Sequence, residues 1–274
     1  MIKKINKKNI TKVICEIGIN HNGSVKTCKE LIKKAHESDS WGVKFQYRNL
    51  KNYFSNYINQ TELGKEIIDK ELKKNYLSPK KIQLLSIYAK KLGLNIGISF
   101  FTSDDIKDFK KFKFDFYKIP SAASDNFDLL NKILNLKKLT LISFGGKTLK
   151  SIEKIIEKVP KNFTKNVVLL HCISNYPVNI INSNLGFIDT LKKKFKNFLI
   201  GYSSHEKQIF NCIYLLSKKI NYIERHITLN IKSDGLDHSS SSEFKDFQIL
   251  NYYCKNLDII DKKNSDKIIN QGEV

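Results

Sequence analysis

The sequence predicts an α/β protein that folds as one (β/α)8 TIM barrel. Eight short apolar runs alternate with eight segments of helical period, and no break in composition interrupts the alternation. The runs are almost continuously apolar, as expected for parallel strands that are covered on both faces. The length of 274 residues also fits one barrel. The alternative is an open doubly wound sheet, which requires no particular number of strands.

The predicted elements follow one another in regular order along the chain. Strands are expected at 12–18, 42–47, 94–100, 115–120, 139–145, 167–173, 198–203 and 222–228. Helices are expected at 25–38, 79–92, 102–112, 127–136, 149–159, 185–195, 208–219 and 243–260. The barrel is therefore assigned to residues 1–261, and 262–274 form a polar tail. A long polar insertion at 48–77 is predicted to be a lid or an oligomer contact.

Composition excludes several classes of protein. No run of 18 apolar residues exists, and the N-terminus has no apolar core typical of a signal peptide, which predicts a cytoplasmic protein without a membrane partner. The five cysteines are odd in number, scattered and without a C-x-x-C pair. They are therefore expected to be reduced thiols rather than a disulfide framework or a zinc site.

The net charge of +21 raises the question of a nucleic-acid partner, but the basic residues are of the wrong kind. Of the 48 lysines and arginines only Arg48 and Arg225 are arginine, which leaves 46 lysines. Bidentate recognition of bases and phosphates relies on arginine, and the lysines mostly occur as KK or KxxK on the predicted helices. We expect no nucleic-acid partner. The positive field is expected to attract an anionic small substrate.

In such a barrel the active site lies at the C-terminal ends of the strands. The polar residues predicted there are Glu16, Asn20, Lys44, Gln46, Ser99, Lys118, Ser121, Ser143, His171, Ser174, Tyr176, Ser203, His205, Glu224, His226 and Asp237. Two lysines and several hydroxyls suit a phosphate or carboxylate ligand. His205 and His226, with a carboxylate such as Glu224 or Asp237, suit a borderline divalent metal. The alternative is that each histidine is only hydrogen-bonded at a strand end, but the convergence at one barrel end favours a site.

Several segments resemble the sialic acid synthase family, which includes the legionaminic and pseudaminic acid synthases. The matching segments are CEIGINHNGS at 15–24, GVKFQ at 42–46, YKIPS at 117–121, LLHCISNYP at 169–177, IGYSSH at 200–205, YIERHITLN at 222–230 and GLDHSSSSE at 235–243. Members of this family condense phosphoenolpyruvate with an N-acylated aminohexose, on a (β/α)8 barrel. The resemblance spans the predicted barrel from end to end.

The resemblance also implies roles for individual residues. His205 and His226 are expected to bind a divalent metal, manganese first, with magnesium or cobalt as alternatives. The residues expected to be catalytic are Glu16, Lys44, Lys118, Tyr176 and Asp237. Those expected to bind substrate are Asn20, Gln46, Ser121, Ser143, Ser174 and Ser203. Phosphoenolpyruvate is expected between the lysines and serines, and the sugar beside Glu16, Gln46, Tyr176 and Asp237.

Three departures from the family pattern affect the expected substrate. Ala123 stands where the family usually has an acidic residue, and SFFTS at 99–103 and SFGG at 143–146 replace the usual loop segments. The sequence also ends before the C-terminal antifreeze-like domain that usually closes over the site of the neighbouring subunit. The resemblance therefore implies a different or smaller aldose, or a cap from a separate chain, with a homodimer as a further expected partnership.

Two functions are compatible with these residues. The first is a metal-dependent synthase that joins phosphoenolpyruvate to an aldose and releases a 3-deoxy-2-ulosonic acid and phosphate. The alternative is a barrel that has lost turnover and acts as a ligand-binding or assembly subunit in a surface-sugar pathway. The retained histidines and lysines favour the first function, and Ala123 with the absent cap favours the second.

Overall fold

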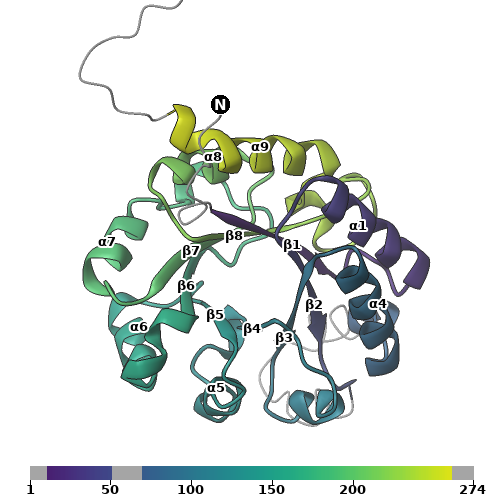
Figure 1. Cartoon of the computed structure of the whole chain (residues 1–274), viewed down its shortest axis with the longest axis horizontal. Coiled ribbons are helices and arrows are strands. Elements are labelled where there is room, and N and C mark those ends of the chain that lie inside the picture. The colour runs from purple at the N-terminus through teal and green to yellow at the C-terminus, as the bar shows by residue number, and fades with distance from the viewer. Residues whose placement is uncertain (1–10, 51–69, 261–274) are drawn as a thin grey trace, which may run out of the picture.

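The computed structural model describes residues 11–50 and 70–260, and these form a closed eight-stranded parallel barrel (Figure 1). The strands are β1 (Lys12–Gly18), β2 (Gly42–Tyr47), β3 (Asn95–Phe100), β4 (Phe116–Ile119), β5 (Leu139–Ser143), β6 (Val167–Cys172), β7 (Leu199–Ser204) and β8 (Tyr222–His226). Pairing of β1 with β8 closes the ring, with Glu16 opposite His226. This closure confirms the predicted TIM barrel and excludes the open sheet. The predicted tail and residues 51–69 of the predicted lid lie outside the described residues.

The helices form an outer ring around the strands (Figure 1). They are α1 (Val25–Glu37), α4 (Pro79–Lys91), α5 (Phe127–Leu134), α6 (Leu149–Ile156), α7 (Phe187–Lys194), α8 (Phe210–Ser217) and α9 (Phe244–Ile260). Four of them begin where a short polar side chain accepts a hydrogen bond from the first turn: Ser24, Ser78, Asn126 and Thr148. In the part of the chain that the structure describes, no helix is long and apolar enough to cross a membrane.

Alternation along each strand decides which side chains enter the barrel. Every second residue points inward, so apolar residues such as Ile14, Phe116 and Leu170 fill the lower part of the interior. Gly97 is required there, because a Cβ at this position would lie 2.1 Å from the Phe116 ring. Further along, the same inward positions carry polar residues. The barrel thus has an apolar base and a polar top at the C-terminal ends of its strands.

The helix predicted at 102–112 is wrong. The segment instead contains a short 3₁₀ helix, η2 (Asp105–Phe109). The Asp105 carboxylate accepts hydrogen bonds from the amides of Phe101 at 3.0 Å and Thr102 at 2.9 Å. An aspartate that binds nearby amides in this way offers the backbone an alternative to a regular helix. The loop after β3 is therefore a fixed structure rather than the start of a helix.

Candidate active site

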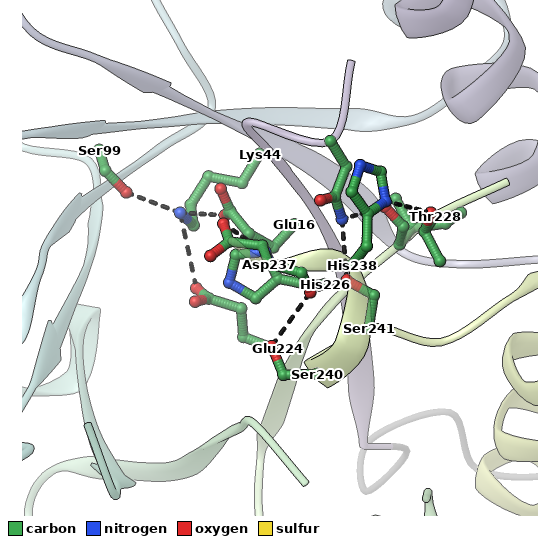
Figure 2. Close-up of polar contacts among 12 residues, drawn as sticks. Glu16, Lys44, Ser99, Glu224, His226, Thr228, Asp237, His238, Ser240 and Ser241 are labelled. Atoms are coloured by element: carbon green, nitrogen blue, oxygen red, sulfur yellow. Dashed lines mark hydrogen bonds and ion pairs between the residues drawn. The ribbon is translucent and has the colours of Figure 1, made fainter. Parts of the chain in front are cut away.

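Four inward-pointing ionic side chains form the floor of the site. Lys44 on β2 contacts the Glu16 carboxylate on β1, and its Nζ donates a hydrogen bond to Ser99 Oγ at 2.6 Å (Figure 2). Lys118 on β4 contacts the Glu224 carboxylate on β8. The second oxygen of Glu224 lies 3.9 Å from Lys44 Nζ. The two lysines and two glutamates are thus one connected network at the centre of the barrel.

The pKa values of the two glutamates in this network are shifted in opposite directions. Burial alone would raise the pKa of Glu224, but the ammonium groups of Lys118 and Lys44 outweigh burial and hold that pKa below its ordinary value. At Glu16 burial dominates and raises the pKa, although Lys44 opposes this shift and Glu224 adds to it. Glu224 is therefore the firmly ionised carboxylate, and Glu16 holds a proton more readily.

Hydroxyl groups surround the floor on the arc from β4 to β7. Ser203 Oγ donates to Glu224 Oε1 at 3.2 Å, and Lys118 Nζ lies 3.4 Å from Ser203 Oγ. Ser143 Oγ is buried and has no hydrogen-bond partner among the described residues. Gly145 N donates to Ser121 Oγ at 2.9 Å, and a Cβ at Gly145 would lie 2.0 Å from Ser174 Oγ. Ser143 is therefore a buried hydroxyl at the cavity whose donor and acceptor are both unsatisfied among the described residues.

The two histidines follow from β7 and β8 and lie together at the cavity. Their ring centroids are 5.8 Å apart. His205 Nδ1 donates to the carbonyl of Ile173 at 2.9 Å, so Nε2 is the nitrogen that retains a lone pair in the neutral ring. Burial lowers the pKa of His205 to about 4 and lowers that of His226 well below its usual value. Both rings are therefore neutral, which is the form that binds a metal.

The donor set fits a divalent metal held by two imidazoles. Within residues 11–50 and 70–260 there is no group of three or more His, Cys, Asp or Glu side chains arranged to hold an ion. Asp237 Oδ2 lies 3.4 Å from His226 Nδ1, on the ring nitrogen that has no hydrogen-bond partner in the described structure. A carboxylate there orients a histidine rather than replacing it. Two protein ligands would leave the other coordination positions to substrate and water.

Two further side chains complete the region around the histidines. The Tyr176 ring lies over His205 with centroids 4.2 Å apart, and 47% of Tyr176 is exposed. Burial raises the pKa of Asp237 to about 7, and nearby Glu16 adds to the rise. Tyr176 therefore packs over a histidine at the open side of the cavity, and Asp237 is near its titration point at neutral pH.

A cavity of about 510 Å³ brings most of the predicted site residues together. Its lining includes Lys44, Gln46, Lys118, Ser121, Ser143, Ser174, Tyr176, Ser203, His205, His226 and Asp237. Glu16 does not line it, because this fully buried residue lies behind Lys44. Asn20 does not line it either, because its amide donates to Ile227 O at 2.9 Å and Ser241 Oγ at 2.8 Å. Those bonds tie the loop after β1 to β8, so the position of Asn20 supports a structural role rather than the predicted contact with substrate.

The cavity also contains residues to which the resemblance assigned no role. Glu224 is predicted from the sequence only as a polar residue of this barrel end and a candidate carboxylate beside the metal, and its spacing of two from His226 places both on the inner face of β8. Arg48 and Phe101 line the cavity from the loops after β2 and β3. No strand pattern identifies loop residues of this kind. Only their juxtaposition in the folded chain brings them into the site.

The residues at and before Ala123, the position where the family usually has an acidic residue, have different surroundings. Ala122 lines the cavity, whereas Ala123 is 7% exposed and packs with the hydrophobic core. An acidic residue introduced at Ala123 would therefore meet apolar surroundings in this chain.

The fold is a TIM barrel, and its ionic floor and paired imidazoles lie at the C-terminal ends of the strands. This is the end at which TIM-barrel enzymes have their active sites. The chain belongs to the NeuB family, whose model matches residues 31–265. It is 32% identical to N-acetylneuraminate-9-phosphate synthase of Drosophila melanogaster, over 87% of this chain and 65% of that protein. It is 31% identical to N,N'-diacetyllegionaminic acid synthase of Campylobacter jejuni, over 94% and 78% of the two chains. The chain thus spans just under two thirds of the fruit-fly protein.

A solved structure gives the same fold over nearly the whole chain. The N-acetylneuraminic acid synthetase of Leptospira borgpetersenii, crystallised with citrate, superimposes with a TM-score of 0.84 at 26% identity. The alignment covers 97% of this chain and 89% of that chain. The sequence resemblance is therefore confirmed by both kinds of comparison.

Proposed function

We propose that this protein joins phosphoenolpyruvate to an aldose in a divalent-metal-dependent reaction that yields a 3-deoxy-2-ulosonic acid and phosphate. The observation that carries the proposal is the Lys44–Glu16 and Lys118–Glu224 network at the floor of the same cavity as the two imidazoles. Family membership supports it, since the relatives are named as synthases of sialic, legionaminic and pseudaminic acids.

The first task of the chain is to hold phosphoenolpyruvate. Lys44 and Lys118 attract its carboxylate and phosphate, and Ser121, Ser143 and Ser203 are placed to donate hydrogen bonds to those oxygens. Glu224 keeps both ammonium groups in position because it contacts Lys118 and lies near Lys44. The enol carbon is then fixed toward the aldehyde of the open-chain sugar.

His205 and His226 would hold the metal, manganese in the first instance. When bound, such an ion supplies Lewis-acid polarisation of a carbonyl oxygen. The enol carbon attacks the aldehyde carbon, a carbon–carbon bond forms, and the aldehyde oxygen takes a proton. Water then adds to the cationic carbon that carries the phosphate and loses a proton, which leaves a hydroxyl on that carbon. Phosphate leaves by cleavage of its bond to this carbon, and the hydroxyl loses its proton to give the keto group. Glu16, with its raised pKa, is the buried carboxyl group best placed to hold a proton beside Lys44.

The test is phosphate release from phosphoenolpyruvate with manganese across a panel of aldoses that includes N-acetylmannosamine and shorter or unacylated sugars. We expect release with at least one sugar, loss of release after chelation, and loss in Lys118→Met. The matched control is Lys138→Met, which removes an exposed lysine elsewhere in the barrel. Calorimetric binding of phosphoenolpyruvate without release from any sugar would instead support the alternative of a binding subunit.

A further inference from the structure

One thiol lies inside the cavity, at a position to which the proposed reaction gives no task. Cys172 is the last residue of β6, and its side chain is among those that line the cavity. Two residues earlier on the same strand, Leu170 points into the apolar base of the barrel. The spacing of two therefore places the Cys172 sulfur on the inner face as well, one level higher, among the polar residues at the strand ends.

The other four cysteines lie in a different environment. They are Cys15, Cys28, Cys212 and Cys254, which pack in the hydrophobic core and do not line the cavity. Burial raises the pKa of Cys15 and Cys254 to about 12 and that of Cys212 to about 11, and it also raises the pKa of Cys28. Their thiols therefore stay protonated at neutral pH, and a protonated thiol is a poor nucleophile. Exposure alone does not separate the two groups, since Cys254 is 7% exposed and Cys172 is 3% exposed.

Polar groups surround the Cys172 sulfur. Cys172 Sγ and Ser121 Oγ form a hydrogen bond of 3.1 Å, in which either group can donate. Gly145 N donates to the same hydroxyl at 2.9 Å. A Cβ at Gly145 would lie 2.9 Å from Cys172 Sγ and 2.0 Å from Ser174 Oγ. The thiol and the two hydroxyls thus meet beside the Gly145 backbone, where the absence of a side chain on glycine leaves room for them.

An unpartnered hydroxyl indicates that this part of the cavity receives a polar molecule. Ser143 is 1% exposed and lines the cavity, and its Oγ has no hydrogen-bond partner among the described residues. Ser143 pairs in register with Leu170, two residues before Cys172, so the hydroxyl and the thiol lie on neighbouring strands at the same end of the barrel. Lys118 lines the same cavity, and partly open, electropositive surroundings are typical of reactive thiols. A small polar reagent that reaches the sulfur therefore finds an open donor and acceptor beside it.

We propose that Cys172 is a modification site, at which hydrogen peroxide oxidises the thiol to a sulfenic acid and thereby prevents phosphoenolpyruvate from binding. In this step a sulfur–oxygen bond forms, the oxygen–oxygen bond of peroxide breaks and one molecule of water leaves, so that sulfur is oxidised and peroxide is reduced. The blocking effect rests on the proposed function, because that function places phosphoenolpyruvate in this cavity.

The position of the added oxygen explains the blocking effect. It occupies the space beside Ser121 and Ser174, which the proposed function gives to the carboxylate or phosphate of phosphoenolpyruvate. Among the described residues, which include all five cysteines, no second cysteine lines the cavity. A disulfide therefore cannot follow within the cavity, and the sulfenic acid persists until an external thiol reduces it.

The first test locates the oxidised residue. The full chain is treated with hydrogen peroxide and dimedone, which traps sulfenic acids, in the presence of magnesium, a metal that peroxide does not oxidise. Peptide mass spectrometry should find Cys172 labelled about tenfold or more above each of the other cysteines, because access and polar surroundings control thiol reactivity. Saturating phosphoenolpyruvate should lower this labelling by about fivefold or more, since the bound anion covers the sulfur. Equal labelling of Cys254 and Cys172, or labelling of Cys172 that phosphoenolpyruvate leaves unchanged, would overturn the inference.

The second test measures the consequence of oxidation by calorimetry. Peroxide-treated wild type should bind phosphoenolpyruvate about tenfold or more weakly than untreated wild type, and dithiothreitol should restore the binding. Cys172→Ala has no thiol to oxidise, so its Kd for phosphoenolpyruvate should change by less than about twofold on peroxide treatment. Cys172→Ser, which keeps a hydroxyl beside Ser121, serves the same purpose if the alanine variant fails to fold. Cys254→Ala is the matched control and should keep the wild-type response to peroxide.

The same measurements separate this inference from the proposed function. Binding of phosphoenolpyruvate that is lost on oxidation of Cys172, without turnover of any sugar, would remove the proposed function and leave the inference standing. Binding and turnover that persist when Cys172 is fully oxidised would leave the proposed function and remove the inference.

Discussion

The two faces of β8 carry buried polar side chains in different surroundings, packed against the outer loops on one face and lining the cavity on the other. Arg225 faces outward, is fully buried, and donates to Ser242 Oγ at 2.6 Å and Ser204 Oγ at 2.7 Å. Its remaining nitrogen donates to the carbonyls of Glu206 at 2.7 Å and Lys207 at 3.1 Å. Its neighbours in sequence, Glu224 and His226, face inward to the cavity.

The two faces differ in whether their buried polar atoms have hydrogen-bond partners. No buried nitrogen or oxygen of the Arg225 side chain or its serine partners lacks a hydrogen bond in the described structure. On the inner face, Glu16 Oε1, Ser143 Oγ and His226 Nδ1 are buried without one. Unsatisfied buried polar atoms cost stability, and a bound ligand can offset that cost by completing their hydrogen bonds. The outer cluster is therefore satisfied within the protein, whereas the inner cluster has capacity for the hydrogen bonds that the proposed function requires.

The largest expected effect comes from breaking the inner cluster. His226→Ala should lower phosphate release by about 10³-fold or more, because it removes one of the two imidazoles proposed to hold the metal. His171 on β6 faces outward and donates to Ser183 O at 2.9 Å, so His171→Gln is the matched control and should retain turnover. Assays with manganese and circular dichroism on both variants check this. Wild-type turnover in His226→Ala, or in metal-free protein, would contradict the metal assignment.

Breaking the outer cluster should instead affect folding. Arg225→Met is expected to lower the free energy of unfolding by about 3 kcal/mol or more, because it leaves two serine hydroxyls and several carbonyls buried without their donor. Urea unfolding at pH 7.5 measures the change. Arg48→Met, at the other arginine, should stay within about 1 kcal/mol of wild type.

Arg225→Lys is a milder substitution that still tests the outer hydrogen bonds if Arg225→Met fails to fold. Arg225→Lys keeps one charged donor but cannot reach all of the acceptors of the guanidinium. It should be destabilised by less than Arg225→Met and still bind phosphoenolpyruvate. Unchanged stability in Arg225→Lys would show that the outer hydrogen bonds contribute less than their number suggests.

The inner cluster was largely predictable from the sequence because strand period and barrel geometry act on it directly. Once the strands are located, a spacing of two fixes which residues face inward, as with Lys44 and Gln46. Glu16 and Asn20 show the limit of this reasoning. Glu16 lies on β1 and Asn20 in the turn after it, but whether each side chain lines the cavity depends on its contacts with Lys44 on β2, with Ile227 after β8 and with Ser241 in the loop before α9.

The two loops that carry Arg48 and Phe101 could not be predicted for a related reason. Their positions depend on Asp105, whose carboxylate accepts hydrogen bonds from backbone amides in both loops. The same residue begins η2, which stands where a helix was predicted at 102–112. Local propensity favoured a helix there, and side-chain hydrogen bonds to the backbone prevailed. Loops that are shaped by such contacts have no regular hydrophobic period from which their structure could be predicted.

The smallest expected effect concerns a buried imidazole that belongs to neither face of β8. In the turn after β1, His21 Nδ1 accepts from Gly23 N at 3.0 Å, which requires the neutral ring. Burial lowers the pKa of His21 to about 4, from an unfolded value of about 6.5. The folded state therefore resists protonation, so its full stability is present above about pH 6.5 and falls as the pH drops toward 4. At pH 5 this amounts to about 1 to 2 kcal/mol for His21.

Urea unfolding of chelator-treated protein at pH 7.5 and pH 5 measures the loss of unfolding free energy on acidification. In His21→Gln this loss should be smaller by the amount that His21 contributes. His36 on α1 is exposed, so His36→Gln is the matched control and should keep the wild-type pH dependence. Because chelation removes metal from His205 and His226, the wild-type loss also contains the contribution of His205, whose pKa is likewise lowered to about 4 by burial. Identical pH dependence in His21→Gln and wild type would mean that the turn after β1 opens to water before its histidine is charged, and would contradict the role given to His21.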